Sequence, residues 1–175
     1  MLHKTLKGKG SYMINIVEYN ECLKKEVNKL MHDILVLEYG FNEFSHGILK
    51  ADNKEFIQEH NKLWVALEND IVIATLGFLK IDDKNILLKK VYSHSAYRGK
   101  GISQKMLNMC INYVKEREYE YIHLETYQQL NRAIAFYEKN GFKQYKSSDK
   151  PEEKREIHYV LELANYSHKN RKCEE

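Results

Sequence analysis

The segment from Ile86 to Thr126 constrains the fold of this chain most strongly. An apolar strand pattern ends near Ser93, a short loop with two glycines follows, and from Gly101 the apolar residues recur with helical spacing. A second strand pattern then alternates apolar and polar residues over Ile122–Thr126. When a helix connects two strands of one sheet, the strands lie parallel to each other and the connection is a right-handed crossover. The sequence therefore predicts a mixed sheet covered by helices.

Further strand patterns stand on both sides of this segment, bounded by polar turns such as Glu68–Asp70. The expected strands are at residues 13–17, 62–67, 71–80, 86–92, 122–126, 142–145 and 157–163. The three strands from residue 62 to residue 92 are joined by short turns, which predicts antiparallel pairing. The fold class is therefore α/β (α+β).

Helices are expected at two further places. Asn20 is predicted to cap a first long helix, and Asn131 is predicted to cap a last helix that ends at Gly141, where a left-handed residue is expected. Residues 39–51 are interpreted as irregular, and a short helix is expected from Asp52 to about His60.

One domain is predicted over residues 1–175. The chain has 175 residues, 43% of them hydrophobic, which suffices for one core and is short for two. Mean hydropathy is -0.64, and no run approaches the roughly 20 apolar residues that a spanning helix needs. The early lysines are not followed by an apolar secretory core, which favours a cytoplasmic protein with no membrane contact.

Charge and cysteine content argue against several classes of partner. The formal net charge is +3, from 28 basic and 25 acidic residues, which disfavours a nucleic-acid-binding protein. Cys22, Cys110 and Cys173 are too scattered for a disulfide framework or a zinc pattern, so plain thiols and no metal are expected. Residues 164–175 are interpreted as a frayed tail.

The chemistry of the chain is expected at the loop between strand and helix, Arg98-Gly99-Lys100-Gly101-Ile102-Ser103. Glycines at a helix N-terminus let a ligand approach the backbone N–H groups beside the positive end of the helix dipole, which favours phosphate. Arg98 and Lys100 would add positive charge for a second phosphate. The spacing fits neither a Walker loop nor a Rossmann loop, and an ordinary basic turn is the alternative.

With this loop the chain resembles the GNAT superfamily of N-acetyltransferases. The resemblance is carried by Arg98, Gly101 and Ser103 after Val91-Tyr92-Ser93-His94, and then by Leu124-Glu125-Thr126, Asn131, Ala133, Phe136-Tyr137 and Asn140-Gly141-Phe142. It covers about residues 62–146, and the residues before them would form the variable substrate side. Two residues depart from the family pattern. Ser103 stands where the family usually has glycine or alanine, and Ser95 stands where proline is common.

This resemblance implies a single domain with a central sheet of about seven strands, flanked by helices, in which strands four and five splay apart. It also implies acetyl-CoA as cosubstrate, with its pantetheine arm in the gap, paired with backbone as an added strand would be. A backbone N–H near Tyr92 or Ser93 would stabilise the thioester oxyanion. The expected contacts to acetyl-CoA are Val91, Tyr92, Ser93, Arg98, Gly99, Lys100, Gly101, Ile102, Ser103 and Asn131.

Some of these residues have a second interpretation from the sequence alone. Asn131 would either bind the pantetheine arm or simply cap its helix. Tyr137 matches the family's usual tyrosine, whose phenol would donate a hydrogen bond to the departing thiolate, while the alternative is a packed core aromatic. Lys89 and Lys90 are interpreted as surface charges or contacts to CoA phosphates.

A general base is expected because an amine with a pKa of about 10.4 is only about a thousandth neutral at pH 7. The strand at residues 86–92 contains no carboxylate. Alternation places Glu125 on the face opposite the helix layer, so Glu125 is the predicted base, acting through water. Glu68, Glu38 and His123 remain alternatives.

The predicted function is therefore acetyl-CoA-dependent N-acetylation, in which an amine attacks the thioester directly. A small primary amine is the favoured acceptor, and a protein N-terminus or lysine is the alternative. From another class, the chain could be a silent module that senses acyl-CoA. Neither the acceptor nor the choice between monomer and homodimer follows from the residues.

Overall fold

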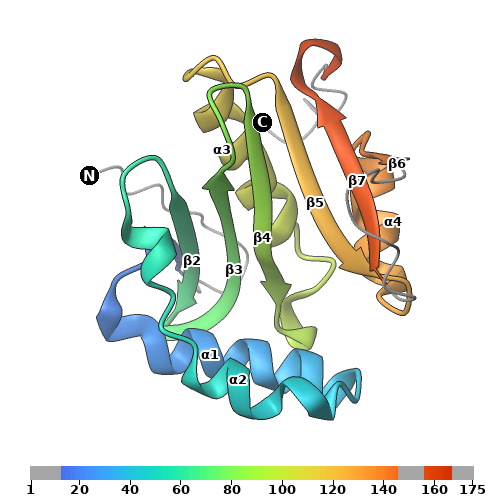
Figure 1. The fold of residues 1–175 in the computed structure, drawn as a ribbon. Helices are drawn as coiled ribbons and strands as arrows, with labels where there is room; N and C mark the ends of the chain where they lie inside the picture. The colour runs from blue at the N-terminus through green and yellow to red at the C-terminus, as the bar shows by residue number, and fades with distance from the viewer. Residues whose placement is uncertain (1–12, 146–155, 167–175) are drawn as a thin grey trace.

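The computed structural model describes residues 13–145 and 156–166, and they form a seven-stranded sheet with helices on both faces (Figure 1). The strands are β1 (Ile14–Glu18), β2 (Lys62–Glu68), β3 (Ile71–Lys80), β4 (Asn85–Ser93), β5 (Tyr121–Tyr127), β6 (Lys143–Tyr145) and β7 (Glu156–Glu162). Their order is β1-β2-β3-β4-β5-β7-β6, and only the β4–β5 pair is parallel. The predicted mixed sheet with a crossover is confirmed. Cys173, residues 1–12 and most of the expected tail lie outside the described residues.

The helices flank this sheet from both sides. They are α1 (Lys24–His32), which continues as π-helical turns over Asp33–Glu38, α2 (Ser45–Lys50), α3 (Ile102–Lys115) and α4 (Asn131–Lys139). Short 3₁₀ turns occupy Glu21–Leu23, Asn42–Phe44, Lys54–Ile57, Ser95–Tyr97 and Leu163–Asn165. No helix in the described part of the chain has the length and apolar character needed to cross a membrane.

The predictions for residues 39–60 are partly wrong. The stretch interpreted as irregular contains α2, and the helix expected from Asp52 to His60 is only the 3₁₀ turn Lys54–Ile57. A six-residue helix is not stable by propensity alone, so tertiary packing decides whether it forms. Here Ile48 is buried, and the Asn28 side chain on α1 donates to the Ala51 carbonyl at 2.7 Å.

The predicted cap of α4 is also wrong. The N-cap is Leu130, and Asn131 is the exposed first residue of the helix, with no capping hydrogen bond from a side chain. Leu130 packs against the hydrophobic cluster on the α1 side of the sheet, so packing rather than cap chemistry sets this helix start. The left-handed residue expected at Gly141 is confirmed, with φ of 87°.

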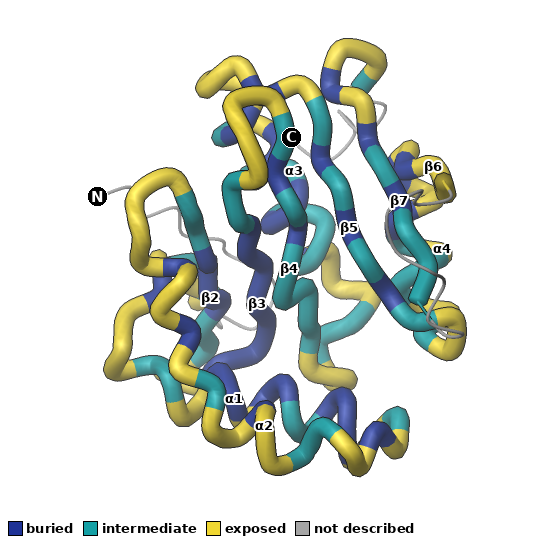
Figure 2. Tube along the Cα trace, in the orientation of Figure 1, coloured by how far each residue is buried: buried dark blue, intermediate teal, exposed yellow. Residues whose placement is uncertain are grey.

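Each face of the sheet has its own hydrophobic core (Figure 2). On one face α3 buries the whole predicted stripe: Ile102, Met106, Leu107, Cys110, Ile111 and Val114. On the other face Val27, Leu30 and Met31 of α1 pack over the inner strands. Fully burying such a side chain stabilises by about 1.5–3 kcal/mol, so both helices are fixed to the sheet. Burial also raises the pKa of the Cys110 thiol, which suits a core residue rather than a nucleophile.

The parallel pair splays apart, as predicted. β4 and β5 are paired only from Asn85 with Tyr121 to Leu88 with Leu124. Beyond these positions the two strands diverge (Figure 1). The edge of β4 that faces β5 therefore lacks a strand partner from Lys89 onward.

A β-bulge lies in this unpaired part of β4. Thr75 pairs with Tyr92 and Gly77 with Lys89, so Lys90 and Val91 together stand opposite one residue of β3. Lys90 has a left-handed backbone, with φ of 54°, and the Thr75 hydroxyl donates to its carbonyl at 2.7 Å. The bulge shifts the alternation of side chains along β4 where this strand diverges from β5.

Candidate active site

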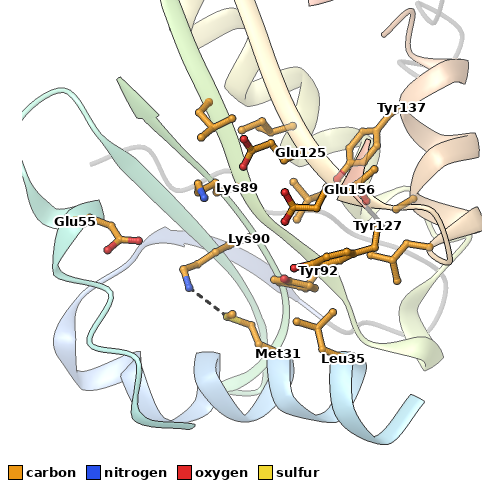
Figure 3. Close-up of a pocket in the computed structure, with 16 residues that line it drawn as sticks. Met31, Leu35, Glu55, Lys89, Lys90, Tyr92, Glu125, Tyr127, Tyr137 and Glu156 are labelled. Carbon is orange, nitrogen blue, oxygen red and sulfur yellow. Dashed lines mark hydrogen bonds between the residues drawn. The ribbon is translucent and has the colours of Figure 1, made fainter. Parts of the chain in front are cut away.

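Two cavities meet where β4 and β5 diverge. One, the loop cavity, has a volume of about 400 Å³ and includes residues of the loop 98–103. The other, the charged cavity, has a volume of about 280 Å³ and is drawn in Figure 3. The residues that line both are Leu35, Val91, Tyr92, Leu130, Ala133 and Tyr137. A molecule bound in one cavity would therefore reach the wall of the other.

The loop has the backbone geometry that a phosphate site needs. Gly99 and Gly101 have φ of 75° and 79°, in the left-handed region that favours glycine. A Cβ placed on either would meet no heavy atom within 4 Å, so open space lies in front of both. Gly101 is the N-cap of α3, whose dipole favours an anion there. Lys100 does not line the cavity, and its Nζ lies 4.9 Å from the centroid of the Tyr97 ring.

Arg98, which is predicted to add positive charge for a phosphate, is paired with Glu38. Its Nη2 donates to Glu38 Oε2 at 2.6 Å, its Nη1 donates to the other carboxylate oxygen, and its Nε donates to the Ser93 carbonyl at 3.0 Å. Arg132 Nη1 lies 3.4 Å from the same carboxylate. The hydrogen bond from Arg98 holds the pKa of Glu38 below its usual value. Glu38 is therefore a poor candidate for the base.

A Glu38→Gln variant is expected to lose about 1 kcal/mol of unfolding free energy at pH 7, because a two-point arginine pair is broken. The folded pKa of Glu38 lies below the unfolded value of about 4.3. The pair therefore stabilises the fold above that pH, and this stabilisation is lost as pH falls through the folded pKa. Urea unfolding should therefore show a larger difference between variant and wild type at pH 7 than at pH 3. An equal difference at both would contradict the assigned pair.

Tyr137 lies on the wall that both cavities share. It is buried, and its ring packs edge-on against Phe136 and Phe142, with centroids 5.7 and 5.6 Å away. Burial raises the pKa of its phenol, so the hydroxyl stays protonated at neutral pH. Within the described residues, no protein group forms a hydrogen bond with that hydroxyl. Tyr137 can therefore donate to a bound molecule.

Tyr92 lies on the same shared wall, next to Tyr137. Burial raises the pKa of its phenol to about 12. The backbone positions expected to meet the pantetheine arm, Val91, Tyr92 and Ser93, all line the loop cavity. Asn131 lines neither cavity, so the structure does not bring it to the other predicted contacts.

The charged cavity contains the predicted base and two further carboxylates, Glu156 and Glu55. Glu125 on β5 lines it, and the predicted alternation is confirmed because Ile122 and Leu124 are buried on the other face. Glu156 on β7 stands opposite Tyr127 and lines the same cavity. Glu156 was missed because the last strand was expected to begin at residue 157. Glu156, His158 and Val160 are alternate residues of one strand and share a face of the sheet, and this period of two could have indicated Glu156.

The other expected polar residues lie elsewhere. The Glu68 carboxylate accepts a hydrogen bond from the Tyr97 hydroxyl, and His123 Nε2 lies 2.8 Å from Asn85 Oδ1. Neither lines the loop cavity or the charged cavity, so the structure does not bring them to the other predicted site residues. Lys89 and Lys90 are both partly exposed and line the charged cavity, and neither lines the loop cavity, where a phosphate contact would be. The bulge in β4 turns Lys90 to this side of the sheet.

Comparison with known proteins identifies the class to which this fold and loop belong. Residues 28–142 match the acetyltransferase (GNAT) family, so the chain belongs to this family of acetyl-CoA-dependent N-acetyltransferases. A solved GNAT acetyltransferase from Staphylococcus aureus Mu50 is 26% identical, with a TM-score of 0.74 over 86% of this chain and 99% of that one.

Two curated relatives are similar in sequence. A mouse protein named "Probable N-acetyltransferase family 8 member 5" is 27% identical over 111 residues, which are 58% of this chain and 49% of the mouse protein. The chain thus spans about half the length of that relative. N-alpha-acetyltransferase 30 of Schizosaccharomyces pombe is 27% identical over 138 residues, which are 77% of this chain and 87% of that protein.

Proposed function

We propose that this chain transfers the acetyl group of acetyl-CoA to the primary amine of a small molecule. One observation carries the proposal: the glycine loop lines one cavity, Glu125 and Glu156 line the other, and Tyr137 lies on the wall that the two cavities share. A donor bound at the loop and an amine bound near the carboxylates would therefore meet beside Tyr137. The family provides the identity of the donor.

The residues of the loop cavity fit acetyl-CoA. The open space in front of Gly99 and Gly101, beside the start of α3, would hold the pyrophosphate. The unpaired edge of β4 offers backbone groups to the amides of the pantetheine arm, as it would to another strand. Acetyl-CoA supplies a thioester carbonyl as the electrophile. A backbone N–H near Tyr92 or Ser93 would stabilise the charge that develops on the carbonyl oxygen.

The amine must lose its proton before it attacks, and Glu125 would accept this proton through water. Tyr137 would donate a hydrogen bond to the departing thiolate, which a phenol with a raised pKa does without losing its proton. Attack is direct: neither cysteine of the described residues is placed to act as a nucleophile, because Cys110 is buried in the core and Cys22 lines neither cavity.

The size of the charged cavity favours a small acceptor. A volume of about 280 Å³ lies at the lower end of the range that holds small ligands. The second candidate is the α-amine of a protein N-terminus, which the relationship to the S. pombe N-alpha-acetyltransferase favours. A competition assay with acetyl-CoA, a panel of small amines and a panel of short peptides distinguishes the two acceptors. We expect the small amines to be acetylated faster. Faster acetylation of the peptides would favour a protein N-terminus as the acceptor.

A Glu125→Gln variant is expected to lose most activity at neutral pH and least at alkaline pH, where the acceptor is already neutral. The measurement is the pH profile of kcat/KM with one amine. Glu116→Gln, at an exposed position at the end of α3, is the control and should follow the wild type. If the profile of Glu125→Gln also runs parallel to the wild type, Glu125 is not the base.

A further inference from the structure

The charged cavity has walls of opposite charge. Glu125 and Glu156 come from β5 and β7, and Lys89 and Lys90 come from β4, across the splay. Figure 3 shows Glu156 beside Tyr137, Glu125 between Tyr137 and Lys89, and Lys90 on the side of Glu55 and α1. A molecule that fills this cavity would therefore meet Glu125 and Glu156 at the reacting end, and at the other end two ammonium groups with the Glu55 carboxylate near them.

The bulge in β4 brings Lys90 into the cavity. Leu88 is buried in the core beneath α3, so regular alternation would turn Lys90 to that same face. Instead the extra residue and the left-handed backbone turn the side chain of Lys90 toward α1, where its Nζ lies 3.6 Å from Met31 Sδ. A left-handed lysine is unfavourable, and such strain gathers at functional sites.

Lys90 has apolar neighbours rather than an acidic partner. Its Nζ lies 5.6 Å from the centroid of the Phe56 ring, and no carboxylate in the described part of the chain forms an ion pair with it. Burial lowers the pKa of Lys90, and the nearby Lys89 lowers it further, while Glu55 offsets part of this effect. A half-buried cation with no ion-pair partner is costly, so an anion from a ligand would be stabilised there.

We infer that the acceptor carries both a primary amine and a carboxylate, as amino acids do, with its carboxylate at Lys90 and its amine beside Glu125 and Glu156. This inference rests on the function proposed above, and names the class of the acceptor. The two charged walls select such a molecule over a diamine, which would place a second cation at Lys90. They also select it over an amine without a carboxylate, which would bring no anion to Lys90.

The test uses matched amines that differ in a single group. The acids run from glycine to 6-aminohexanoate, and each is compared with its carboxamide, which has the same shape and no negative charge. With the wild type, kcat/KM for the best acid is expected to exceed that for its amide by at least about tenfold, as a charge-assisted hydrogen bond would provide. Equal rates for every acid and amide pair would overturn the inference.

Variants at Lys90 then locate the preference. In Lys90→Met the ratio of acid to amide should fall to about one, because the charge is lost while the chain length is kept, and in Lys90→Arg it should stay above one. Lys50→Met is the control, since Lys50 is exposed at the end of α2 and lines neither cavity. A ratio in Lys90→Met as high as in the wild type would also overturn the inference.

The two proposals fail in different ways. If amides and acids are acetylated at equal rates, the proposed acetyl transfer is supported, and the inference that the acceptor carries a carboxylate is wrong. Absence of transfer to every amine, with acetyl-CoA still bound, removes the transferase and the acceptor class with it. Calorimetry of the best acid with the CoA-loaded protein gives a second readout, and binding is expected to weaken at least about tenfold in Lys90→Met.

Discussion

A Gly101→Glu variant is expected to bind acetyl-CoA at least about 100-fold more weakly than the wild type. Gly101 is the N-cap of α3, and the space in front of its missing Cβ is open. A glutamate side chain would fill this space and place a negative charge against the pyrophosphate, opposing the attraction of the helix dipole. Isothermal titration calorimetry with acetyl-CoA measures the loss.

Gly101→Ala is the matched control for this experiment. Both variants carry the same backbone cost, about 1 kcal/mol or somewhat more, because Gly101 has φ of 79°. The alanine Cβ meets no atom within 4 Å, so it leaves most of the site open. Affinity should fall far less in Gly101→Ala than in Gly101→Glu. Unchanged affinity in a folded Gly101→Glu protein would show that the loop does not bind the pyrophosphate.

The second large effect is expected at Tyr137. A Tyr137→Phe variant should lower kcat about 10- to 100-fold and leave affinity for acetyl-CoA nearly unchanged, because the lost hydrogen bond acts in the transition state. The ring contacts with Phe136 and Phe142 are kept, so folding should not change. Steady-state kinetics and calorimetry together separate the two quantities.

Tyr113→Phe offers a control with the same chemical change. Tyr113 on α3 packs against Trp64 of β2 and Phe78 of β3, and it lines neither cavity. It should therefore keep the turnover of the wild type. If Tyr137→Phe also kept that turnover, Tyr137 would be a packing residue with no part in catalysis.

The sequence predicts the parts of the fold that depend on the spacing of apolar residues within one strand or helix. The strand expected at residues 71–80 is β3 with the same bounds, and every apolar residue predicted for the stripe of α3 is buried. The alternation that selected Glu125 is confirmed, because a two-residue period decides the face of a strand. The glycines of the loop were found for a similar reason, since a left-handed backbone favours glycine.

The remaining features depend on contacts between distant parts of the chain. Glu38 pairs with Arg98, 60 residues away, and no local pattern indicates such a pair. The position of Lys90 depends on a bulge that forms only when β4 pairs with β3. α2 is stabilised by packing on α1, although its six residues are too few for a helical period to be visible.

Acetyl transfer to an amine is expected where the two cavities meet. It is tested by following free CoA thiol and N-acetylated amine together in one reaction of the wild-type protein with acetyl-CoA and small amines. We expect equal amounts of both products and no thiol release above background without an amine. Release of thiol without acetylated amine, or tight binding of acetyl-CoA with no transfer to any amine, would show that the chain is not an amine acetyltransferase.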